Sequence, residues 1–267
     1  MPISTSVPIN HIDKAAFHRI DEMVTVLALD IQRDSKRMID GNLYQTELAD
    51  RIQQAGHAVE RNVRVTASFD DYHKEYRIDL IVAGNVVVKA KTAIRLTRQH
   101  KAQLTNSVFL TNANHGTLLN FGAENLEHHS ISTSRNESSR KKITCTSMDW
   151  KILTPTCRIF HDALCRVLCD WGSGLDVAVY RDAVLHFLGR NETMARDVEM
   201  TPDQRPMGRR KMHLLTKDLA FAITDSGAPL THLVERHRQL LQETKLKALQ
   251  LANLNGQHLS LHTIQRN

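Results

Sequence analysis

The first part of the chain carries two stretches in which apolar residues return every three or four positions. One runs from residue 13 to about 33, and this spacing predicts a helix with one buried face. The other runs from about 43 to 55 and stops at Gly56, which is a suitable C-terminal cap for a second helix. Residues 1–12 show no period, so we expect a loose N-terminal arm there.

After these helices the period shortens to that of strands. Apolar and polar residues alternate from Val63 onward, and the run 76–82 leads through a Gly-Asn turn into the valines 86–88, which is typical of a hairpin. The remaining expected elements are one helix at about 96–110 and two strands at 117–121 and 129–132. The order helix, helix, three strands, helix, strand, strand predicts an α/β domain over residues 13–132.

The second half of the chain repeats features of the first half in the same order. Tyr44–Leu48 resembles Tyr180–Val184, 136 positions later, and Asn120–Ile131 matches Asn253–Ile264 without a gap at a spacing of 133. Such self-similarity predicts an internal duplication, with a second, diverged copy of the domain over residues 152–267. The alternative is that two unrelated α/β segments share a pattern by convergence.

Composition narrows the class of protein. Residues 133–151 are small and polar without an apolar period, so we expect a linker between the two copies. No apolar stretch is long enough to cross a bilayer and four cysteines are too few for a secreted disulfide scaffold, which predicts a cytoplasmic protein without membrane contact. A formal net charge of +6 is compatible with a polyanionic partner but does not establish one.

Four residues of zinc-ligand type follow one another at intervals of four in the second copy. They are Cys157, His161, Cys165 and Cys169. On a helix this stripe would span about 18 Å, whereas every ligand of one zinc ion must lie about 2.0 to 2.3 Å from it. The pattern therefore favours a core-facing helix stripe, and we expect no metal site.

Several segments of the first copy together carry a resemblance to a known family. They are Tyr76–Val82, Lys89–Lys91, His100–Leu104 and Leu118–Gly122. In this order they resemble the GxxExxY family, a branch of the PD-(D/E)XK nuclease superfamily, over about residues 20–132, and the repeat extends the resemblance weakly to 152–265. The resemblance implies two tandem restriction-endonuclease-like α/β domains, each a small mixed sheet flanked by helices.

The superfamily's chemistry needs a divalent metal held by carboxylates, and the matching positions here have lost most of them. In the first copy the helix Glu falls on Gly41, the strand Asp on Asp79, the Glu of ExK on Lys89 and its Lys on Lys91. In the second copy the corresponding positions are Val177, His213, Ala222 and Thr224. A cation at the place of a metal ligand would repel Mg²⁺, so neither copy is expected to cut nucleic acid or to use a cofactor.

The loss of carboxylates at these positions suggests a different use for the cleft that would hold the metal in the superfamily. Lys89 and Lys91 alternate with apolar residues and should point to one face of their strand. Further polar residues that could line a basic groove with them are Arg95, Arg98, His100, Lys101 and Gln103. The leading prediction is non-catalytic binding of DNA or RNA. A protein-interaction or scaffold role is the alternative, and a residual Mg²⁺-dependent nuclease, resting on Asp79 and Lys91, comes third.

Overall fold

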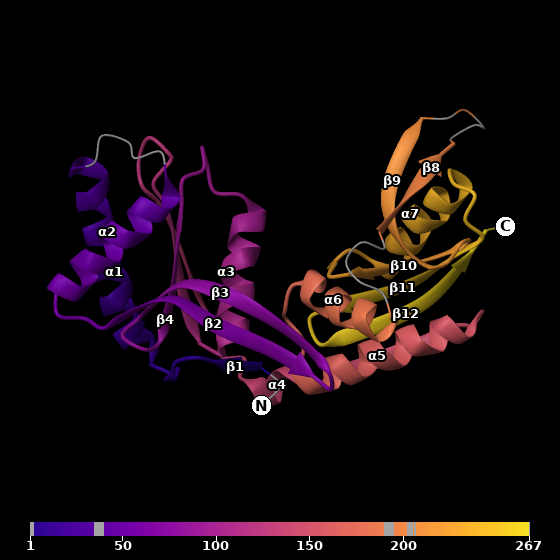
Figure 1. Ribbon diagram of the computed structural model, residues 1–267, viewed down its shortest axis with the longest axis horizontal. Coiled ribbons are helices and arrows are strands. Elements are labelled where there is room, and N and C mark those ends of the chain that lie inside the picture. Colours follow the sequence, from indigo (N-terminus) through magenta and orange to yellow (C-terminus); the bar gives the residue numbers. More distant parts are fainter. Residues whose placement is uncertain (1–2, 35–39, 190–194, 202–204, 206, 267) are drawn as a thin grey trace. The chain divides into compact units, whose positions relative to one another are not determined.

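The computed structural model describes residues 3–34, 40–189, 195–201, 205 and 207–266 (Figure 1). The chain divides into two compact units, Met1–Glu137 and Ser138–Asn267, which we call unit 1 and unit 2 and describe separately. Each unit contains one six-stranded mixed sheet with helices packed on it. The protein is therefore a mixed α/β structure.

Unit 1 follows the predicted order of elements. Its helices are α1 (Lys14–Asp34), α2 (Gly41–Gln54) and α3 (Arg98–Thr111), and its strands are β1 (Ile3–Thr5), β2 (Val59–Phe69), β3 (Tyr72–Val82), β4 (Val86–Lys91), β5 (His115–Asn120) and β6 (Glu127–Ser132). The sheet order is β1-β2-β3-β4-β5-β6. Only β4 and β5 run parallel, because α3 carries the chain back between them, as a parallel connection requires.

Helices cover both faces of this sheet (Figure 1). The apolar stripe of α1, which includes Val24 and Ile31, packs with α2 onto the face that carries Leu80, Val82 and Val88. On the opposite face α3 approaches closely, since a Cβ at Gly116 of β5 would lie 2.7 Å from a Val108 methyl group. Because both faces of the sheet are buried, the two central strands contain continuous apolar runs.

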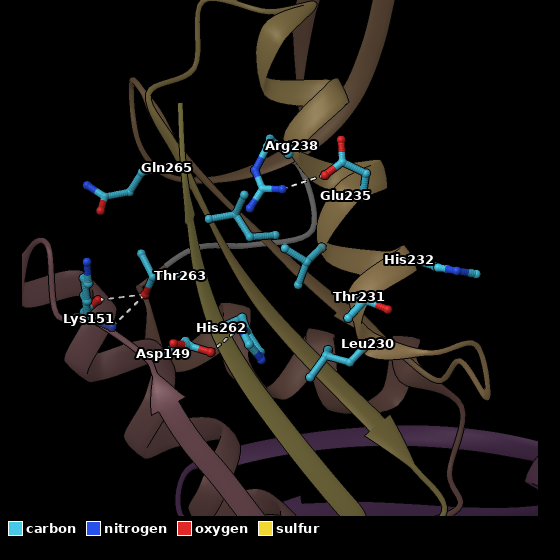
Figure 2. A pocket seen from close by; sticks show the side chains of 12 residues that line it. Asp149, Lys151, Leu230, Thr231, His232, Glu235, Arg238, His262, Thr263 and Gln265 are labelled. Atoms are coloured by element: carbon cyan, nitrogen blue, oxygen red, sulfur yellow. Dashed lines mark hydrogen bonds and ion pairs between the residues drawn. The ribbon is translucent and has the colours of Figure 1, made fainter. Parts of the chain in front are cut away.

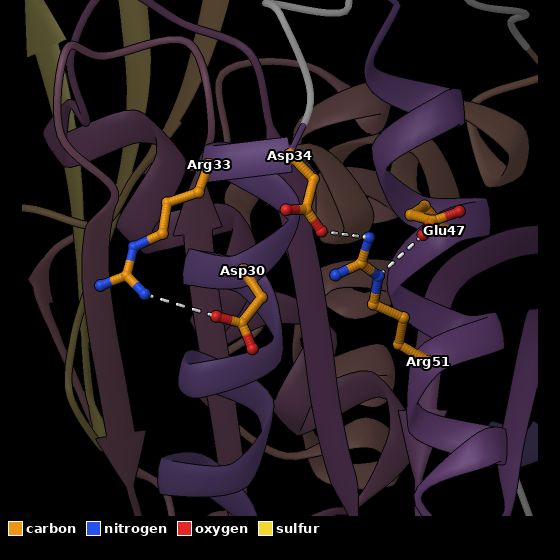
Figure 3. A network of polar contacts seen from close by, with 5 residues as sticks. All are labelled: Asp30, Arg33, Asp34, Glu47 and Arg51. Carbon is orange, nitrogen blue, oxygen red and sulfur yellow. Dashed lines mark hydrogen bonds and ion pairs between the residues drawn. The ribbon is translucent and has the colours of Figure 1, made fainter.

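Charged side chains tie the two helices of the first face together (Figure 3). The Arg51 guanidinium of α2 lies 2.7 Å from a Glu47 carboxylate oxygen one turn away and 2.9 Å from an Asp34 oxygen at the end of α1. Hydrogen bonds to Glu47 and Asp34 raise the pKa of Arg51 above its ordinary value. Arg51, in the last turn of α2, therefore bridges the end of α1 and Glu47 of its own helix.

Unit 2 contains the same order of two helices, three strands, one helix and two strands as unit 1, and a short helix and a strand precede them where unit 1 has a strand alone. Its helices are α4 (Glu137–Arg140), α5 (Pro155–Trp171), α6 (Val177–Phe187) and α7 (Leu230–Gln242), and its strands are β7 (Thr144–Asp149), β8 (Ala195–Met200), β9 (Gly208–Thr216), β10 (Leu219–Thr224), β11 (Ala248–Asn255) and β12 (His258–Gln265). The sheet order is β7-β12-β11-β10-β9-β8. Strands β8 to β12 thus neighbour one another as β2 to β6 do, and the parallel pair β10–β11 corresponds to β4–β5.

The structure differs from the sequence prediction in the two segments expected to be irregular. Residues 3–5 of the expected N-terminal arm form β1, which pairs with β2. Within the expected linker 133–151, residues 144–149 form β7, which pairs in parallel with β12. Both are edge strands, whose outer side faces solvent, so a polar composition without an apolar period does not prevent pairing. In the part of the chain that is described, no helix is long and apolar enough to span a membrane.

Candidate functional site

Three of the four predicted site positions of the first copy meet on the α3 face of the unit 1 sheet, namely Asp79, Lys89 and Lys91. The fourth, Gly41, begins α2, where a Cβ would lie 3.5 Å from the Thr92 hydroxyl oxygen. Val87 pairs with Gly116, which faces α3, so Lys89 and Lys91 at alternate positions of β4 point to that face as predicted. Asp79 of β3 lies opposite Lys89 of β4, because both are one position beyond the paired residues Leu80 and Val88. The Lys89 Nζ is 3.4 Å from the Asp79 Oδ2.

Burial decides what this pair of residues can do. The Lys89 side chain is 10% exposed and that of Asp79 is 21% exposed. Burial lowers the pKa of Lys89, while the Asp79 carboxylate opposes this shift and Lys91 adds to it. An ammonium in this position needs its carboxylate partner. Lys89 is therefore the internal counter-ion of Asp79, and the sequence-based picture of Lys89 in an open groove is replaced by that of an almost closed ion pair.

Lys91 lies one pleat further along β4 and is half-buried. Among the described residues no carboxylate oxygen comes within 4.0 Å of its ammonium group. Lys91 pairs with Asn120 of β5, and Asn120 pairs in turn with Glu127 of β6. Glu127 accepts hydrogen bonds from the Asn120 amide at 2.6 Å and from the Leu96 N–H at 2.7 Å. Glu127 thus serves the local structure, and Lys91 remains an unneutralised cation.

Asn120 is a structural residue that sequence reasoning missed. Its side chain accepts from the Ala93 N–H at 2.8 Å and donates to the Ala93 carbonyl oxygen at 2.9 Å. Gly122 belongs to the same contact, because a Cβ there would lie 2.5 Å from the Thr92 carbonyl carbon. The available signal was a polar residue inside the apolar run 118–121, which is unusual for a fully buried strand. These contacts, which we call the Asn120 clamp, fix the connection between β4 and α3.

This connection and the start of α3 carry the other predicted cations. Arg95, Arg98 and Lys101 are exposed, and the sequence from Lys89 to Ala123 contains no Asp or Glu. Burial lowers the pKa of His129 on β6, and the nearby Lys101 lowers it further. The end of β4 and the first turn of α3 therefore form a basic corner, which we define as Lys91, Arg95, Arg98 and Lys101.

The two remaining predicted groove residues have local contacts. The His100 Nδ1 receives a hydrogen bond from the Thr97 N–H, while the His100 N–H donates to the Thr97 hydroxyl, so His100 and Thr97 form a capping box at the start of α3. The backbone oxygen of Gln103 accepts from the Ser107 hydroxyl at 2.9 Å. His100 thus has a structural hydrogen bond and is not assigned to the basic corner.

In unit 2 the predicted positions are apolar or uncharged, and one assignment changes. Phe221 pairs with His213, so Met212 stands opposite Ala222, as Asp79 stands opposite Lys89. Met212 and Ala222 belong to the core under α7, whereas the His213 ring lies 5.5 Å from that of Phe221 on the other face. A register shift between β9 and β10 causes the difference. Val177 begins α6 as Gly41 begins α2.

No candidate metal site is found in the described ranges. Within them, no three His, Cys, Asp or Glu side chains are arranged to hold an ion. The stripe predicted to face the core does so only at its start: Cys157 is buried and lies 3.3 Å from the Gln250 amide nitrogen, whereas Cys169 is exposed. A metal of the kind that the sequence resemblance implies for unit 1 would meet Asp79, which is already paired with Lys89. The residues present at this site do not fit a divalent cation.

Comparison with known proteins agrees with this geometry. Residues 18–132 match a family model described as the PD-(D/E)XK nuclease superfamily. Over this range unit 1 is similar to proteins of this superfamily. The matched segment begins in α1 and ends with β6, so it covers the basic corner and somewhat less than half of the chain. No curated protein and no solved structure matches the sequence.

Proposed function

We propose that this protein is a degenerate, internally duplicated member of the GxxExxY branch of the superfamily, and that it binds nucleic acid without cutting it. The observation that carries the proposal is the Asp79–Lys89 ion pair, which occupies the place where active relatives hold metal. The binding surface is the basic corner of unit 1. The four free cysteines suit the reducing cytoplasm that we expect for the protein.

Matching local contacts in the two units support the duplication. Asp40 caps α2 and Asp176 caps α6, each accepting from the backbone N–H two residues later. Asn253 of unit 2 clamps Ser226, accepting from its N–H at 3.1 Å and donating to its oxygen at 3.1 Å, as Asn120 clamps Ala93. Such details are not required by a shared α/β pattern, so common origin explains them better than convergence does.

The chemistry of the pair argues against cleavage. Phosphodiester hydrolysis by this superfamily needs carboxylates free to hold a divalent ion that activates water. Here the Asp79 carboxylate is neutralised by Lys89, and Gly41 offers no side chain at the helix position. Two like unit charges about 4 Å apart repel by roughly 4 kcal/mol at an effective dielectric of 20. A divalent cation beside Lys89 would meet a larger repulsion.

The charge balance of the basic corner favours a phosphate backbone as partner. Its four cations lack carboxylate partners within ion-pair distance in the described structure, and Glu127 on the strand beside β5 is engaged by Asn120 and Leu96. Unpaired cations on one surface release counterions when they contact phosphates, which makes binding salt-dependent and largely independent of base sequence.

Fluorescence anisotropy with short labelled single- and double-stranded DNA and RNA tests the proposal. Replacing Arg95, Arg98 and Lys101 together by Ala should abolish binding at physiological salt, and Lys91→Ala alone should lower the log–log salt slope by about one. Lys14→Ala, an exposed cation on α1 at the opposite face, is the matched control and should bind as wild type does. Absence of binding even at low salt would reject the nucleic-acid role and favour the protein-interaction alternative.

Cleavage is tested separately with the same oligonucleotides in Mg²⁺ and Mn²⁺. We expect intact substrate with the wild-type protein. Metal-dependent cleavage that disappears in Asp79→Ala would overturn the proposed inactivity while leaving the binding result untouched.

A further inference from the structure

Unit 2 contains a cavity that the nuclease resemblance does not explain. It has a volume of about 760 Å³ and lies between α7 and β12, with the end of β7 at one side. Its lining includes Leu230, Val234, Glu235 and Arg238 of α7 and His262 and Ile264 of β12. All of them belong to unit 2, so the cavity does not depend on how the units are arranged. Its size lies within the range of small-ligand sites, about 300 to 1,000 Å³.

One wall of the cavity is apolar. Leu230 and Val234 lie one turn apart on α7 and are only half-buried, although they belong to the hydrophobic cluster that includes Ile264. In unit 1 the corresponding helix carries Lys101 at the position of Val234, at the spacing of 133, so this wall is particular to unit 2. Apolar surface left open in a cavity favours a ligand with an apolar body.

The polar groups stand at the two ends of the cavity (Figure 2). At one end the Arg238 Nη1 donates to the Glu235 Oε2 at 2.6 Å. At the other end the His262 Nδ1 lies 3.4 Å from the Asp149 Oδ2. Figure 2 shows His232 pointing away from both groups, so His232 does not belong to the polar ends of the cavity.

The polar groups of the cavity that could still contact a ligand are mainly hydrogen-bond donors. Glu235 is engaged by Arg238, and Asp149 faces the His262 ring. A guanidinium has five N–H donors in a planar fork, so Arg238 keeps donors beyond the one given to Glu235. Lys151, at the β7 side of the cavity, adds an ammonium that has no carboxylate within ion-pair distance in the described structure. Donors and cations at the ends of an apolar wall suit an anion.

We propose that this cavity binds a small organic anion, a carboxylate or phosphate attached to an apolar or aromatic body. The anionic group meets Arg238, and the body lies against Leu230 and Val234. The site is independent of the basic corner, because it shares no residue with it. Failure of one proposal therefore leaves the other standing.

Anilinonaphthalene sulfonate, which joins an aromatic body to an anion, is the probe. Its fluorescence on titration should show one saturable site in the wild-type protein. Arg238→Ala should weaken binding at least about tenfold, because a charge-assisted hydrogen bond is lost and Glu235 is left facing the anion. Arg236→Ala is the matched control, an exposed arginine of the same helix that does not line the cavity, and should change affinity less than about twofold.

Two further arms make the outcome decisive. Val234→Asp, which places a carboxylate on the apolar wall, should remove binding while the far-UV circular dichroism stays unchanged. Displacement of the probe by hexanoate or by adenosine monophosphate supports the proposal and tells an aliphatic carboxylate from a nucleotide. The proposal is overturned if Arg238→Ala and Arg236→Ala behave alike, if the uncharged analogue phenylnaphthylamine binds as tightly as the sulfonate, or if neither competitor displaces it.

Discussion

Removing the carboxylate of Asp79 should destabilise unit 1, because it leaves the Lys89 ammonium buried without a partner. Breaking a fully buried ion pair from one side costs about 3 to 5 kcal/mol. The side chains are 10% and 21% exposed, so water reaches the pair to a limited extent and the cost falls below that range. We expect Asp79→Ala to lower the free energy of unfolding by about 2 kcal/mol.

The double variant Asp79→Ala with Lys89→Met should recover most of that loss. A linear apolar side chain fills the volume of the lysine stem and needs no counter-ion, and buried pairs generally come close to break-even against such replacements. A double-mutant cycle on the two single variants and the double variant should therefore give a coupling energy well above the roughly 0.5 kcal/mol expected for independent sites.

Amide hydrogen exchange read by mass spectrometry is the suitable assay. Both tryptophans, Trp150 and Trp171, lie in unit 2, so fluorescence unfolding reports on that unit and serves as the internal control. About 2 kcal/mol corresponds to roughly thirtyfold faster exchange of the core amides in β3 and β4, at about 1.4 kcal/mol for each factor of ten. Unchanged exchange in Asp79→Ala, or additive single variants, would refute the claim that the pair is a buried counter-ion unit.

The pH dependence of the single variant gives a second check. Burial lowers the pKa of Lys89 below its ordinary value, and without Asp79 the largest opposing effect is gone. The unfolded chain then binds more protons than the folded chain between the lowered pKa and about 10.4, so stability rises with pH in that window. The melting temperature of Asp79→Ala relative to wild type should therefore improve from pH 7 toward pH 9.5.

Three further outcomes follow from contacts elsewhere in unit 1. Gly122→Ala should cost about 1 to 3 kcal/mol by urea unfolding, because the new Cβ meets backbone atoms of Thr92 and Ala93, whereas Gly227→Ala, with open space around it, should stay within about 0.5 kcal/mol. The Asp21 hydrogen bond raises the pKa of His128, and although burial raises the pKa of Asp21, hydrogen bonds from His128 and Thr117 bring it below its ordinary value. Their mutual stabilisation is thus complete between about pH 4 and 6.5 and is lost above the raised His128 pKa, so Asp21→Asn should be more destabilising at pH 5.5 than at pH 9; equal losses at both would contradict the pairing. Arg51→Ala should cost about 0.5 to 1 kcal/mol in the same assay, with the loss reduced by high salt.

The periodicity of apolar residues was sufficient to predict the helices and the hairpin of unit 1. It also placed Lys89 and Lys91 on one face correctly, because alternation along a strand depends only on the local backbone. The pairing of β7 could not be seen in the same way. Thr144 pairs with His258, far along the chain, and an edge strand needs no apolar alternation to form. Its partner, which local sequence does not reveal, determines that it is a strand.

The candidate site likewise combines features that the local sequence predicts with features that depend on distant parts of the chain. The loss of carboxylates at Gly41 and Lys89 is visible in the sequence, but the burial of Lys89 is not, since it depends on α3 and on the neighbouring strand. A one-residue shift between β9 and β10 exchanged Met212 for His213 opposite Ala222. Shifts of this kind reverse the face of every following side chain, so site positions transferred from one similar segment to another are least secure after a turn.

The Asp79–Lys89 pair also bears on how a chain with two similar sheets folds without mixing them. Strands β4 and β10 hold the same place within the corresponding strands β2 to β6 and β8 to β12, so each could in principle enter the other sheet while the protein folds. A β4 strand in the unit 2 sheet would set Lys89 opposite Met212, among the leucines under α7, with no carboxylate to meet it. An unpaired buried ammonium costs several kcal/mol. The ion pair thus gives β4 a requirement that the unit 2 sheet does not meet, which favours pairing of β4 with its own neighbours.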